Sequence, residues 1–289
     1  MHISIRRIAI TLILVCAMPS AALAWGGLGH RTVAAVAMSL LPSAKAARID
    51  AILHKLEIDQ DFVDSASYPD EYIRDHDPGR KFSPWHFADL PDDNSVFDCK
   101  GKCLFTALNT NLTVIQIGAD TKADAVALAW VIHLVGDMHQ PLHMSGRDGG
   151  GNGFPVTYRG QTTCLNYSGK PANVELHSVW DDCLVEELAN GRTPQQLAHD
   201  LLGGITTYKG RSEIDVNDPT PWNKWGDESH TLANSVAFDS LKHGDDLGDA
   251  YIQPKALSVV EKQLLVAGIR LAYLLDENFP DKPKAGGHH

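Results

Sequence analysis

Apolar positions recur at intervals of three or four residues along most of the chain, which is the pattern of amphipathic helices. Alternation of apolar and polar residues is confined to 155–165, which predicts a short β-hairpin turning at Arg159 and Gly160. Segments 76–100 and 207–226 are rich in Pro, Asp, Gly and Trp and are expected to be ordered loops. The chain is therefore predicted to be mainly α-helical. The predicted helices are 30–41, 43–57, 104–118, 121–139, 176–190, 194–203, 228–242 and 255–276.

The first 24 residues have the parts of a secretory signal. A basic start precedes an apolar run over 8–18, and an Ala-x-Ala cleavage site ends at Ala24. The run is shorter than the roughly 20 residues that span a bilayer, and no later stretch of the sequence is long enough. We therefore expect a signal peptide over 1–24, a secreted or periplasmic product with no membrane span, a single domain over 25–281 and a flexible tail over 282–289.

The balance of charge is acidic. The formal net charge is −11, and removing the signal segment makes it −13 because Arg6 and Arg7 leave with no acidic residue. Proteins that hold nucleic acid mainly through Lys and Arg are basic, so this class is excluded. A chain of this charge that acts on nucleic acid needs another attraction for phosphate, and bound metal ions would supply it.

Four cysteines remain beyond the signal segment: Cys99, Cys103, Cys164 and Cys183. An even count in an exported protein favours two disulfides. Of the three possible pairings, the spacing favours Cys99 with Cys103 and Cys164 with Cys183. A zinc site built from all four is the alternative, although Cys-x3-Cys with Cys-x18-Cys matches the usual zinc spacing poorly.

Histidine and aspartate recur on apolar faces of two predicted helices. His133 and Asp137 are four residues apart, and so are His177 and Asp181, so each pair shares one helix face. His143 lies just beyond the proline that must end the first of these helices, and it can turn back toward the same site. Burying such groups without partners costs several kcal/mol, and a divalent cation is an efficient partner.

The expected mature N-terminus adds a further ligand. Cleavage after Ala24 leaves Trp25 with a free α-amine five residues before His30. Such an amine titrates at about 7.7–8.0 and can bind a metal near neutral pH. Each residue also has an ordinary alternative: a histidine can pack in a core, Asp137 can cap a helix or pair with an arginine, and Asp70 can cap a helix after a proline. The joint pattern favours a metal site.

Taken in order, the motifs resemble those of the zinc-dependent S1/P1 nucleases. They are WGxxGH at the expected mature start, a Pro-Asp element, WHFxD, HxxxDxHQPLH, a GGGN loop and LHSVWD. They span about residues 25 to 183, and the helical remainder is compatible with the single-domain phospholipase C/P1 nuclease-like fold. The residues that carry the resemblance to the family's ligands are Trp25, His30, Asp70, His86, His133, Asp137, His143, His177 and Asp181.

The resemblance implies three zinc ions. The bridged pair would activate a water, with Asp70 orienting it or accepting its proton, and the third ion would stabilise the departing 3′-oxygen. Neutral imidazoles and carboxylates with open positions are what catalytic zinc requires. The implied ligand sets are Asp70, His86, His133 and Asp137; the Trp25 amine and carbonyl with His30 and the bridging Asp137; and His143, His177 and Asp181.

The resemblance also implies an endonuclease of single-stranded DNA and RNA that leaves 5′-phosphate products and acts as a 3′-nucleotidase, expected to be a monomer. Phe87 matches the family's base-stacking residue, and Asp89, Gly150 and Asn152 match groups that contact the base edge. Stacking needs unpaired bases and contributes about 1–3 kcal/mol per base, which favours single strands over duplex. A place in the core is the alternative for Phe87.

Two positions depart from the family pattern. Ile73 stands where family members commonly carry Lys or Arg, and Arg74 follows one step later. Glu175 stands where Asn is frequent before the LH of LHSVWD. The first departure affects stabilisation of charge in the transition state, and the second places an acidic group beside the expected metals.

Two other functions stay open. A zinc-dependent phospholipase C shares the helical fold and an N-terminal Trp ligand, but it typically has a longer Trp-to-His interval and a Glu where this chain has Asp181. The second alternative is a secreted zinc-binding protein without turnover. The open coordination implied by a zinc with three protein ligands argues against it.

Overall fold

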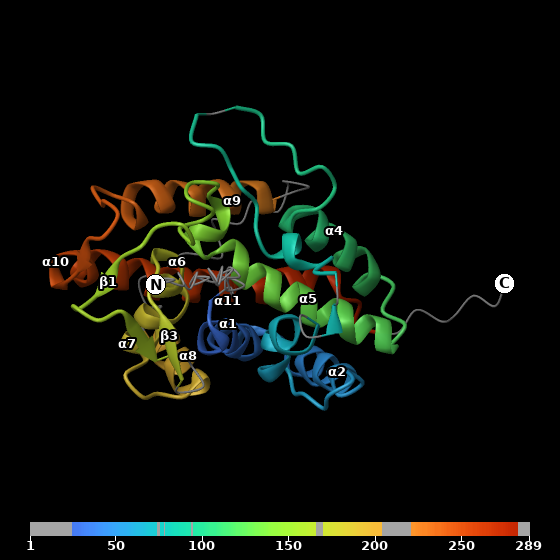
Figure 1. The fold of residues 1–289 in the computed structure, drawn as a ribbon. Coiled ribbons are helices and arrows are strands. Elements are labelled where there is room, and N and C mark those ends of the chain that lie inside the picture. The colour runs from blue at the N-terminus through green and yellow to red at the C-terminus, as the bar shows by residue number, and fades with distance from the viewer. Residues whose placement is uncertain are drawn as a thin grey trace, which may run out of the picture.

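The computed structural model describes residues 25–73, 76–77, 79–93, 95–165, 170–203 and 221–282. Helices make up most of this part, and strands are few and short, which confirms the mainly α-helical prediction (Figure 1). Among the described residues, no helix combines the length and the apolar character needed to cross a membrane. The expected signal segment 1–24 and the end of the expected tail, 283–289, lie outside the described residues.

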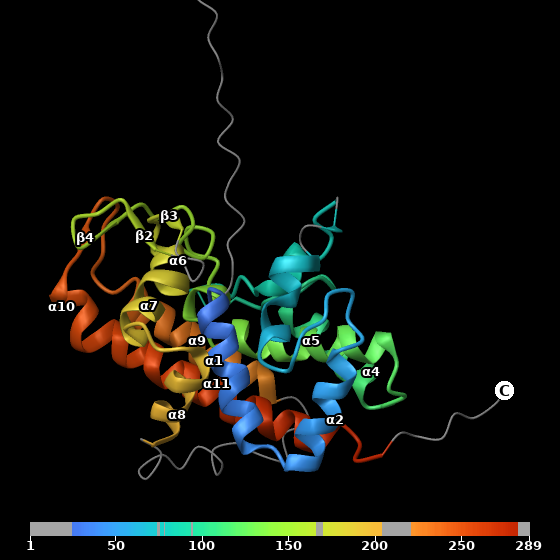
Figure 2. The same cartoon turned by 90° about the horizontal axis from the view of Figure 1, so that it is seen from below.

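Helices α1 (Gly27–Leu40), α5 (Lys122–Met138) and α11 (Leu257–Asn278) form the centre of the fold. Helix α5 contacts α4 (Leu104–Ile115) and α11, while α1 contacts α11, α5 and α8 (Pro194–Gly203). Figures 1 and 2 show α11 running behind α5, with α1 beside both. Side chains from α1 and α5 can therefore meet in the interior.

The chain makes α5 a core helix for local reasons. Thr121 and Asp124 form a capping box at its start, which satisfies free backbone N–H groups of the first turn. From Ala127 to Met138 every residue of the helix is buried, as expected of a helix that is apolar on nearly all sides. A His or Asp in this stretch must therefore find its partners inside the protein.

Helix α1 is held against α11 at close range. A Cβ added at Gly268 of α11 would lie 2.4 Å from Cβ of Val36 on α1, a distance that no side chain tolerates. Glycine at this position lets the two backbones approach. The tight crossing fixes the position of α1 and of the side chains that it directs toward α5.

The predicted helices are present with adjusted ends. Helix α2 (Ser43–Leu53) ends before the predicted 57, and α4 ends at Ile115 rather than at 118. The predicted helix 176–190 is continuous but contains a wider turn, because α6 (Leu176–Ser178) and α7 (Leu184–Ala189) are joined by a π-helical turn, η5 (Val179–Cys183). Such π turns are frequent at functional sites.

Near the C-terminus one loop prediction is wrong in part. Helix α9 (Pro221–Leu232) begins before the predicted 228, so residues 221–226 are helical and not loop, while 207–220 lie outside the described residues. Proline at its first position is compatible with a helix start, since the missing N–H would be unpaired there anyway. The π turn η8 (Ala233–Ala237) ends this element before the predicted 242.

The last helix is preceded by two short turns. Helix α10 (Asp249–Tyr251) and the π turn η9 (Ile252–Ala256) lead into α11, whose first residue is close to the predicted 255. The predicted loop 76–100 contains one short 3₁₀ helix, η3 (Ser83–His86). The chain between η3 and α4 projects from the body at the top of Figure 1.

The predicted hairpin is confirmed at its turn and differs beyond it. Arg159 and Gly160 have positive φ, and a bridge joins Tyr158 with Gln161 across them. The two arms then take other partners. Strand β1 (Thr157–Tyr158) pairs in parallel with β4 (Asp246–Leu247), and β2 (Thr163–Leu165) pairs antiparallel with β3 (Pro171–Asn173), with Thr163 opposite Asn173. Hairpins this short are marginal alone, so packing decides their partners.

Both predicted disulfides are present. They join Cys99 to Cys103 and Cys164 to Cys183, so the alternative of a zinc site built from all four cysteines is wrong. The second bond ties β2 to the π turn η5 and thereby holds the helix that carries Asp181.

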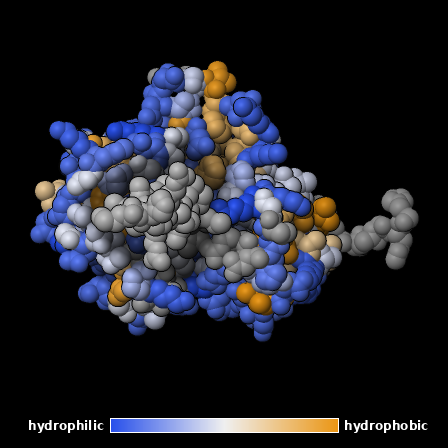
Figure 3. All heavy atoms as spheres, in the orientation of Figure 1, coloured by the Kyte–Doolittle hydropathy of each residue, from blue (hydrophilic) through white to orange (hydrophobic). Residues whose placement is uncertain are grey.

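The surface outside the grey atoms of Figure 3 is mostly hydrophilic, as the composition leads one to expect. On the projecting segment, Val96 is 95 % exposed. Isolated apolar residues of this kind are normal on protein surfaces.

Candidate metal centre and substrate pocket

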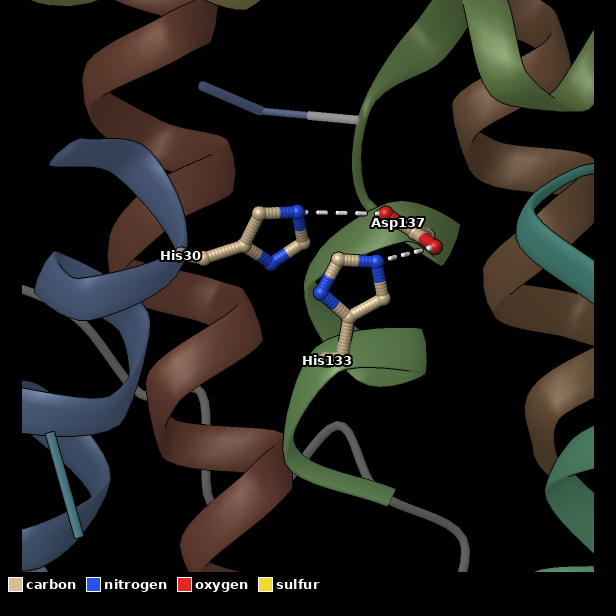
Figure 4. A group of neighbouring side chains, drawn as sticks. All are labelled: His30, His133 and Asp137. Atoms are coloured by element: carbon tan, nitrogen blue, oxygen red, sulfur yellow. Dashed lines mark ion pairs between the residues drawn. The ribbon is translucent and has the colours of Figure 1, made fainter. Parts of the chain in front are cut away.

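A buried cluster of His and Asp lies between α1 and α5. His133 and Asp137 are one turn apart on α5, and His30 reaches them from α1 (Figure 4). All three are buried, and the rings of His30 and His133 stack with their centroids 3.9 Å apart. The spacing of four residues on α5 thus brings its two side chains to one point, as predicted.

The two oxygens of Asp137 face different partners. Its Oδ2 lies 3.2 Å from His133 Nε2 and 3.2 Å from His86 Nδ1, while its Oδ1 lies 3.3 Å from His30 Nε2. Asp70 completes the cluster, with Oδ1 3.7 Å from His86 Nδ1. This is the arrangement of a carboxylate that can bridge two cations. We call the five residues His30, Asp70, His86, His133 and Asp137 the α5 group.

Short turns deliver the two members of the α5 group that come from neither α1 nor α5. Asp70 lies in the π turn η2 (Pro69–Ile73), inside the turn rather than at a cap. His86 ends the 3₁₀ helix η3, and its side chain is 13 % exposed, so packing alone does not account for it. These turns bring Asp70 Oδ1 to 3.7 Å from His86 Nδ1 and to 3.8 Å from His133 Nε2.

A second cluster adjoins the first. His143, from the 3₁₀ helix η4 (Pro141–Met144), places Nε2 3.1 Å from His177 Nε2, and His177 Nε2 lies 3.1 Å from Asp181 Oδ2. His143 Nδ1 lies 3.9 Å from Asp137 Oδ1, so the two clusters are neighbours. We call His143, His177 and Asp181 the pocket group.

Backbone carbonyls orient three of the imidazoles. Nδ1 of His133 donates to Ala66 O at 2.8 Å, and Nδ1 of His177 donates to Gly150 O at 2.5 Å. Nδ1 of His143 donates to the carbonyl of His86 at 2.6 Å. A carbonyl only accepts, so each Nδ1 carries the proton and each Nε2 directs its lone pair into the cluster. This is the usual arrangement of a histidine that binds a metal.

The polar atoms that remain suit a cation. In the described part of the chain, both ring nitrogens of His30 and Oδ1 of Asp137 are buried without a hydrogen-bond partner. The Nε2 atoms of His143 and His177 face one another, and two lone pairs at that distance need a proton or a metal between them. Three sets of side chains have ligand atoms within 4.8 Å of one another and could hold a metal ion: His30, His133 and Asp137; Asp70, His86 and His133; His143, His177 and Asp181.

The charges in the α5 group shift the pKa values strongly when no metal is bound. Burial lowers the pKa of His133, but the carboxylates of Asp137 and Asp70 outweigh burial and raise it to about 9. Burial and the neighbouring His133 lower the pKa of His30 to about 4. Burial would raise the pKa of Asp137, yet His133 and the other imidazoles hold it well below its usual range. The group therefore favours an ionised Asp137 with a cation beside it.

In the pocket group the two histidines shift in opposite directions. Burial lowers the pKa of His143, whereas for His177 the charge of Asp181 outweighs burial and raises it. Gln140 was not anticipated from the sequence. Its Nε2 donates to Asp181 Oδ1 at 2.6 Å and so fixes the carboxylate, and a buried polar residue beside two histidines was the available signal.

Trp25 directly precedes a residue that is hydrogen-bonded to the pocket group. Its side chain is fully buried in the core, and the next residue, Gly26, donates its N–H to Asp181 O at 2.8 Å. The start of α1 is thereby tied to the π turn that holds Asp181. Asp182, the following residue of that turn, was not anticipated either. Burial, Asp181 and Glu186 raise its pKa to about 7.

The four residues expected to contact a base all line one pocket of about 210 Å³. Phe87 is half-buried and is not among the aromatic residues packed against the core. Asp89, Gly150 and Asn152 line the pocket with it. The alternative of a core position for Phe87 is therefore wrong. The pocket also includes His86, His143 and His177, so it opens directly onto both groups.

Three lining residues were missed by the sequence: Ser83, Leu142 and Gly149. Ser83 lies three residues before His86, and Gly149 belongs to the GGGN loop, so proximity to known motifs was the only signal. Of the two departures, Ile73 is half-buried and Arg74 lies outside the described residues. Glu175 precedes α6 and is half-buried, and burial raises the pKa of its carboxyl group.

Comparison with known proteins agrees with this geometry. A sequence model of the S1/P1 nuclease family matches residues 25–280. The chain is 30 % identical to Endonuclease 4 of Arabidopsis thaliana over 99 % of this chain and 100 % of the relative. It is 31 % identical to Nuclease S1 of Aspergillus oryzae, over 87 % and 91 % of the two chains. It is 26 % identical to Nuclease P1 of Penicillium citrinum, over 88 % and 97 %. The chain therefore belongs to the S1/P1 nuclease family and is an endonuclease, a hydrolase of phosphodiester bonds in nucleic acids.

Proposed function

We propose that this endonuclease is an exported three-zinc enzyme that cuts single-stranded DNA and RNA, leaves 5′-phosphate ends and also acts as a 3′-nucleotidase. The observation that carries the proposal is the pocket in which Phe87 and Asn152 adjoin His86, His143 and His177. A base-binding surface and a set of metal-ligating side chains share one cavity. A nucleotide seated there has its phosphate beside the histidines.

Three ligand sets would hold the zinc ions. Imidazole nitrogen and carboxylate oxygen are suitable donors for zinc, and the orienting carbonyls hold three of the rings as ligands require. The Trp25 amine is available only if residues 1–24 are removed. The proposed sets are Asp70, His86, His133 and Asp137; Trp25 through its amine and carbonyl with His30 and Asp137; and His143, His177 and Asp181.

Bound zinc supplies Lewis acidity toward phosphoryl oxygens and lowers the pKa of a coordinated water. The residues of this chain do the rest. Asp70 is the one carboxylate of the α5 group at its outer side, 8 % exposed, where it can orient the attacking water and accept its proton. Gln140 and Gly150 hold Asp181 and His177 in place. Asp137 contacts both His30 and His133 and so links the two rings of the α5 group.

Single-stranded nucleic acid suits the size and lining of the pocket. A cavity of about 210 Å³ receives a base only after the base has left a duplex. Phe87 offers a face for stacking, and Asp89 and Asn152 offer polar atoms for the base edge. A free 3′-nucleotide fits the same place, because its base and phosphate reach the same two sides of the pocket. Binding of a single strand or of a free 3′-nucleotide in this pocket needs one copy of the chain, so we propose that the enzyme acts as a monomer.

Export is supported by the two disulfides, which form and persist in oxidising compartments. We infer cleavage after Ala24 and a secreted or periplasmic location. An acidic enzyme is compatible with a nucleic-acid substrate here, because bound zinc ions would supply the positive charge that its surface lacks.

The proposal is tested with a protein that begins at Trp25. Single-stranded RNA, single-stranded DNA and duplex DNA are incubated with it, with and without a chelator, beside phosphatidylcholine. We expect chelator-sensitive cleavage of both single strands, slow cleavage of duplex, and fragments with 5′-phosphate ends. Cleavage of the lipid alone would assign a phospholipase C, and metal content without any hydrolysis would assign a zinc-binding protein.

A substitution in the pocket tests the role of Phe87. Phe87→Ala should raise KM for single-stranded RNA by roughly 5- to 150-fold, since a stacked base contributes about 1–3 kcal/mol. Zinc content should stay unchanged. Phe97→Ala is the matched control, because this phenylalanine packs near Phe105 on the projecting segment, outside the pocket. Equal effects of the two variants would remove the stacking role.

A further inference from the structure

Gly26, at the start of helix α1, is in close contact with the carboxylate of Asp182. A Cβ added at Gly26 would lie 2.0 Å from Oδ1 of Asp182, so the carboxylate occupies the space that any other side chain at position 26 would need. The hydrogen bond from Gly26 N to Asp181 O holds the two segments in this register. Asp182 therefore sits against the backbone of the second residue of the expected mature chain.

Asp182 lacks the partner that its burial calls for. Its exposure is 8 %, yet within the described ranges it forms no hydrogen bond and no ion pair. Its neighbours increase the need for one, because Asp181, Asp70 and Glu186 act on it with like charge. An ionised carboxylate left buried in this way is strongly destabilising, and proteins normally supply a cation or donors. An arriving group with N–H donors would remove that cost.

The expected processing creates such a group one residue away. Neighbouring Cα atoms are about 3.8 Å apart, so the nitrogen of Trp25 is within roughly 5 Å of the Gly26 Cα that Asp182 contacts. Before cleavage this nitrogen is an amide with one N–H and a chain attached to it. After cleavage it is an amine with several N–H groups and no chain in the way.

We propose that Asp182 accepts a hydrogen bond from the α-amine of Trp25 in the processed chain and so positions the new N-terminus. Asp182 is a positioning residue, since it acts through Trp25 and not on the substrate. The inference rests on the proposed cleavage after Ala24. Partners of this kind fix the orientation of a metal ligand, and their loss typically weakens metal affinity by about 10- to 100-fold. The contact thus makes one zinc site depend on removal of the signal segment.

A role in packing alone predicts something different. If Asp182 only filled space, an amide of the same shape would serve equally well in every form of the chain, and removing its charge would relieve repulsion from Asp181 and Glu186. If Asp182 binds the amine, its replacement harms the processed chain and leaves an extended chain unharmed. The effect of Asp182→Asn must then depend on where the chain begins.

The experiment compares two starting points. One protein begins at Trp25 and the other keeps Ala24 before it, and each is made with Asp182 and with Asp182→Asn. Unfolding midpoints are measured without metal, and zinc affinity is measured by competition with a chromogenic chelator. In the chain that begins at Trp25, the substitution should lower the unfolding midpoint. It should also weaken the affinity for one of the zinc ions by about 10- to 100-fold. In the chain with Ala24 it should leave zinc affinity unchanged and keep or raise the midpoint.

Asp200→Asn is the control, because this exposed carboxylate of α8 pairs with Arg192 and is not among the charges that act on Asp182. It should change both chains equally. An equal effect of Asp182→Asn in both chains, or no effect in the chain that begins at Trp25, would overturn the proposal. Neither measurement uses activity. A chain that passes this test but does not cut RNA would disprove the proposed function and leave the contact with Asp182 in place.

Discussion

The α5 group and the pocket group are built in different ways, although both consist of His and Asp. His133 and Asp137 of the α5 group are fully buried in the C-terminal half of the regular helix α5, and His30 comes from a second helix packed on it. The pocket group stands on the 3₁₀ turn η4, the three-residue helix α6 and the π turn η5, and two of its three residues line the pocket. The first group is fixed by the core, and the second by local turns and their hydrogen bonds.

The two groups therefore suit two different tasks of a metal-dependent hydrolase, which are holding charges away from water and meeting the substrate. A site in the core holds its charges away from water, where electrostatic interactions are strong and neighbouring pKa values shift far. A site on turns can meet a substrate of variable shape, at the cost of needing additional contacts such as the one from Gln140 to Asp181. We expect loss of the α5 group to be the more damaging, and three predictions test this.

The largest effect is expected from Asp137→Asn. This carboxylate contributes to two of the three proposed zinc sites, so the variant should keep about one zinc in place of three. Activity should fall by more than about 10³-fold, beyond the 10²–10³ that removal of a single electrostatic group typically costs. Metal analysis and hydrolysis of single-stranded RNA measure both. Asp200→Asn, at an exposed residue paired with Arg192, is the control and should change neither. Full metal retention in Asp137→Asn would contradict bridging.

A smaller and more selective loss is expected from His177→Ala. Its ring belongs only to the pocket group, so one zinc should leave while the two proposed for the α5 group stay bound. Activity should fall by about 10²–10³-fold. If His177→Ala lost as much zinc as Asp137→Asn, the two groups would be one cooperative unit and the comparison between them would fail.

The smallest effect concerns the stability of the metal-free protein. The pKa of His133 in the fold, about 9, is above its ordinary value, so its contribution to the free energy of unfolding is complete below pH 6.5 and is lost as pH rises through 9. The pKa values of His30, about 4, and His139, about 3, are lowered, so stability also falls as pH drops below 6.5. The metal-free chain should therefore be most stable near pH 6.5.

Denaturant unfolding with a chelator present, at pH 5, 6.5 and 9, measures this profile. His133→Asn should remove a loss on the order of 3 kcal/mol from the alkaline side, at 1.36 kcal/mol per pKa unit, and leave only the loss from His177, whose pKa is also raised. His143, whose pKa is lowered, gives no loss on the alkaline side, so His143→Asn should leave that slope in place. An undiminished slope in His133→Asn would assign the titration to another group.

Much of the site was predictable because its residues obey local spacing. The i,i+4 spacing of His133 and Asp137 places both on one helix face, and the same holds for His177 and Asp181 even though a π turn interrupts the second helix. The cysteine spacing predicted both disulfides. The early start of α9 and the separate partners of β1 and β2 were not predictable, because short segments take their structure from what packs on them.

The sequence by itself determined the helical class, the two His-x3-Asp pairs, the paired cysteines and the set of motifs that identify the family. Tertiary structure alone decided that His30 of α1 meets Asp137 of α5, which depends on the close crossing of α1 and α11 at Gly268. It also decided which ring nitrogen of His133, His143 and His177 faces inward and that Asp182 is buried without a partner among the described residues. The physical reason is that periodicity reports which side of one element is buried, whereas contacts between elements depend on how closely distant segments pack.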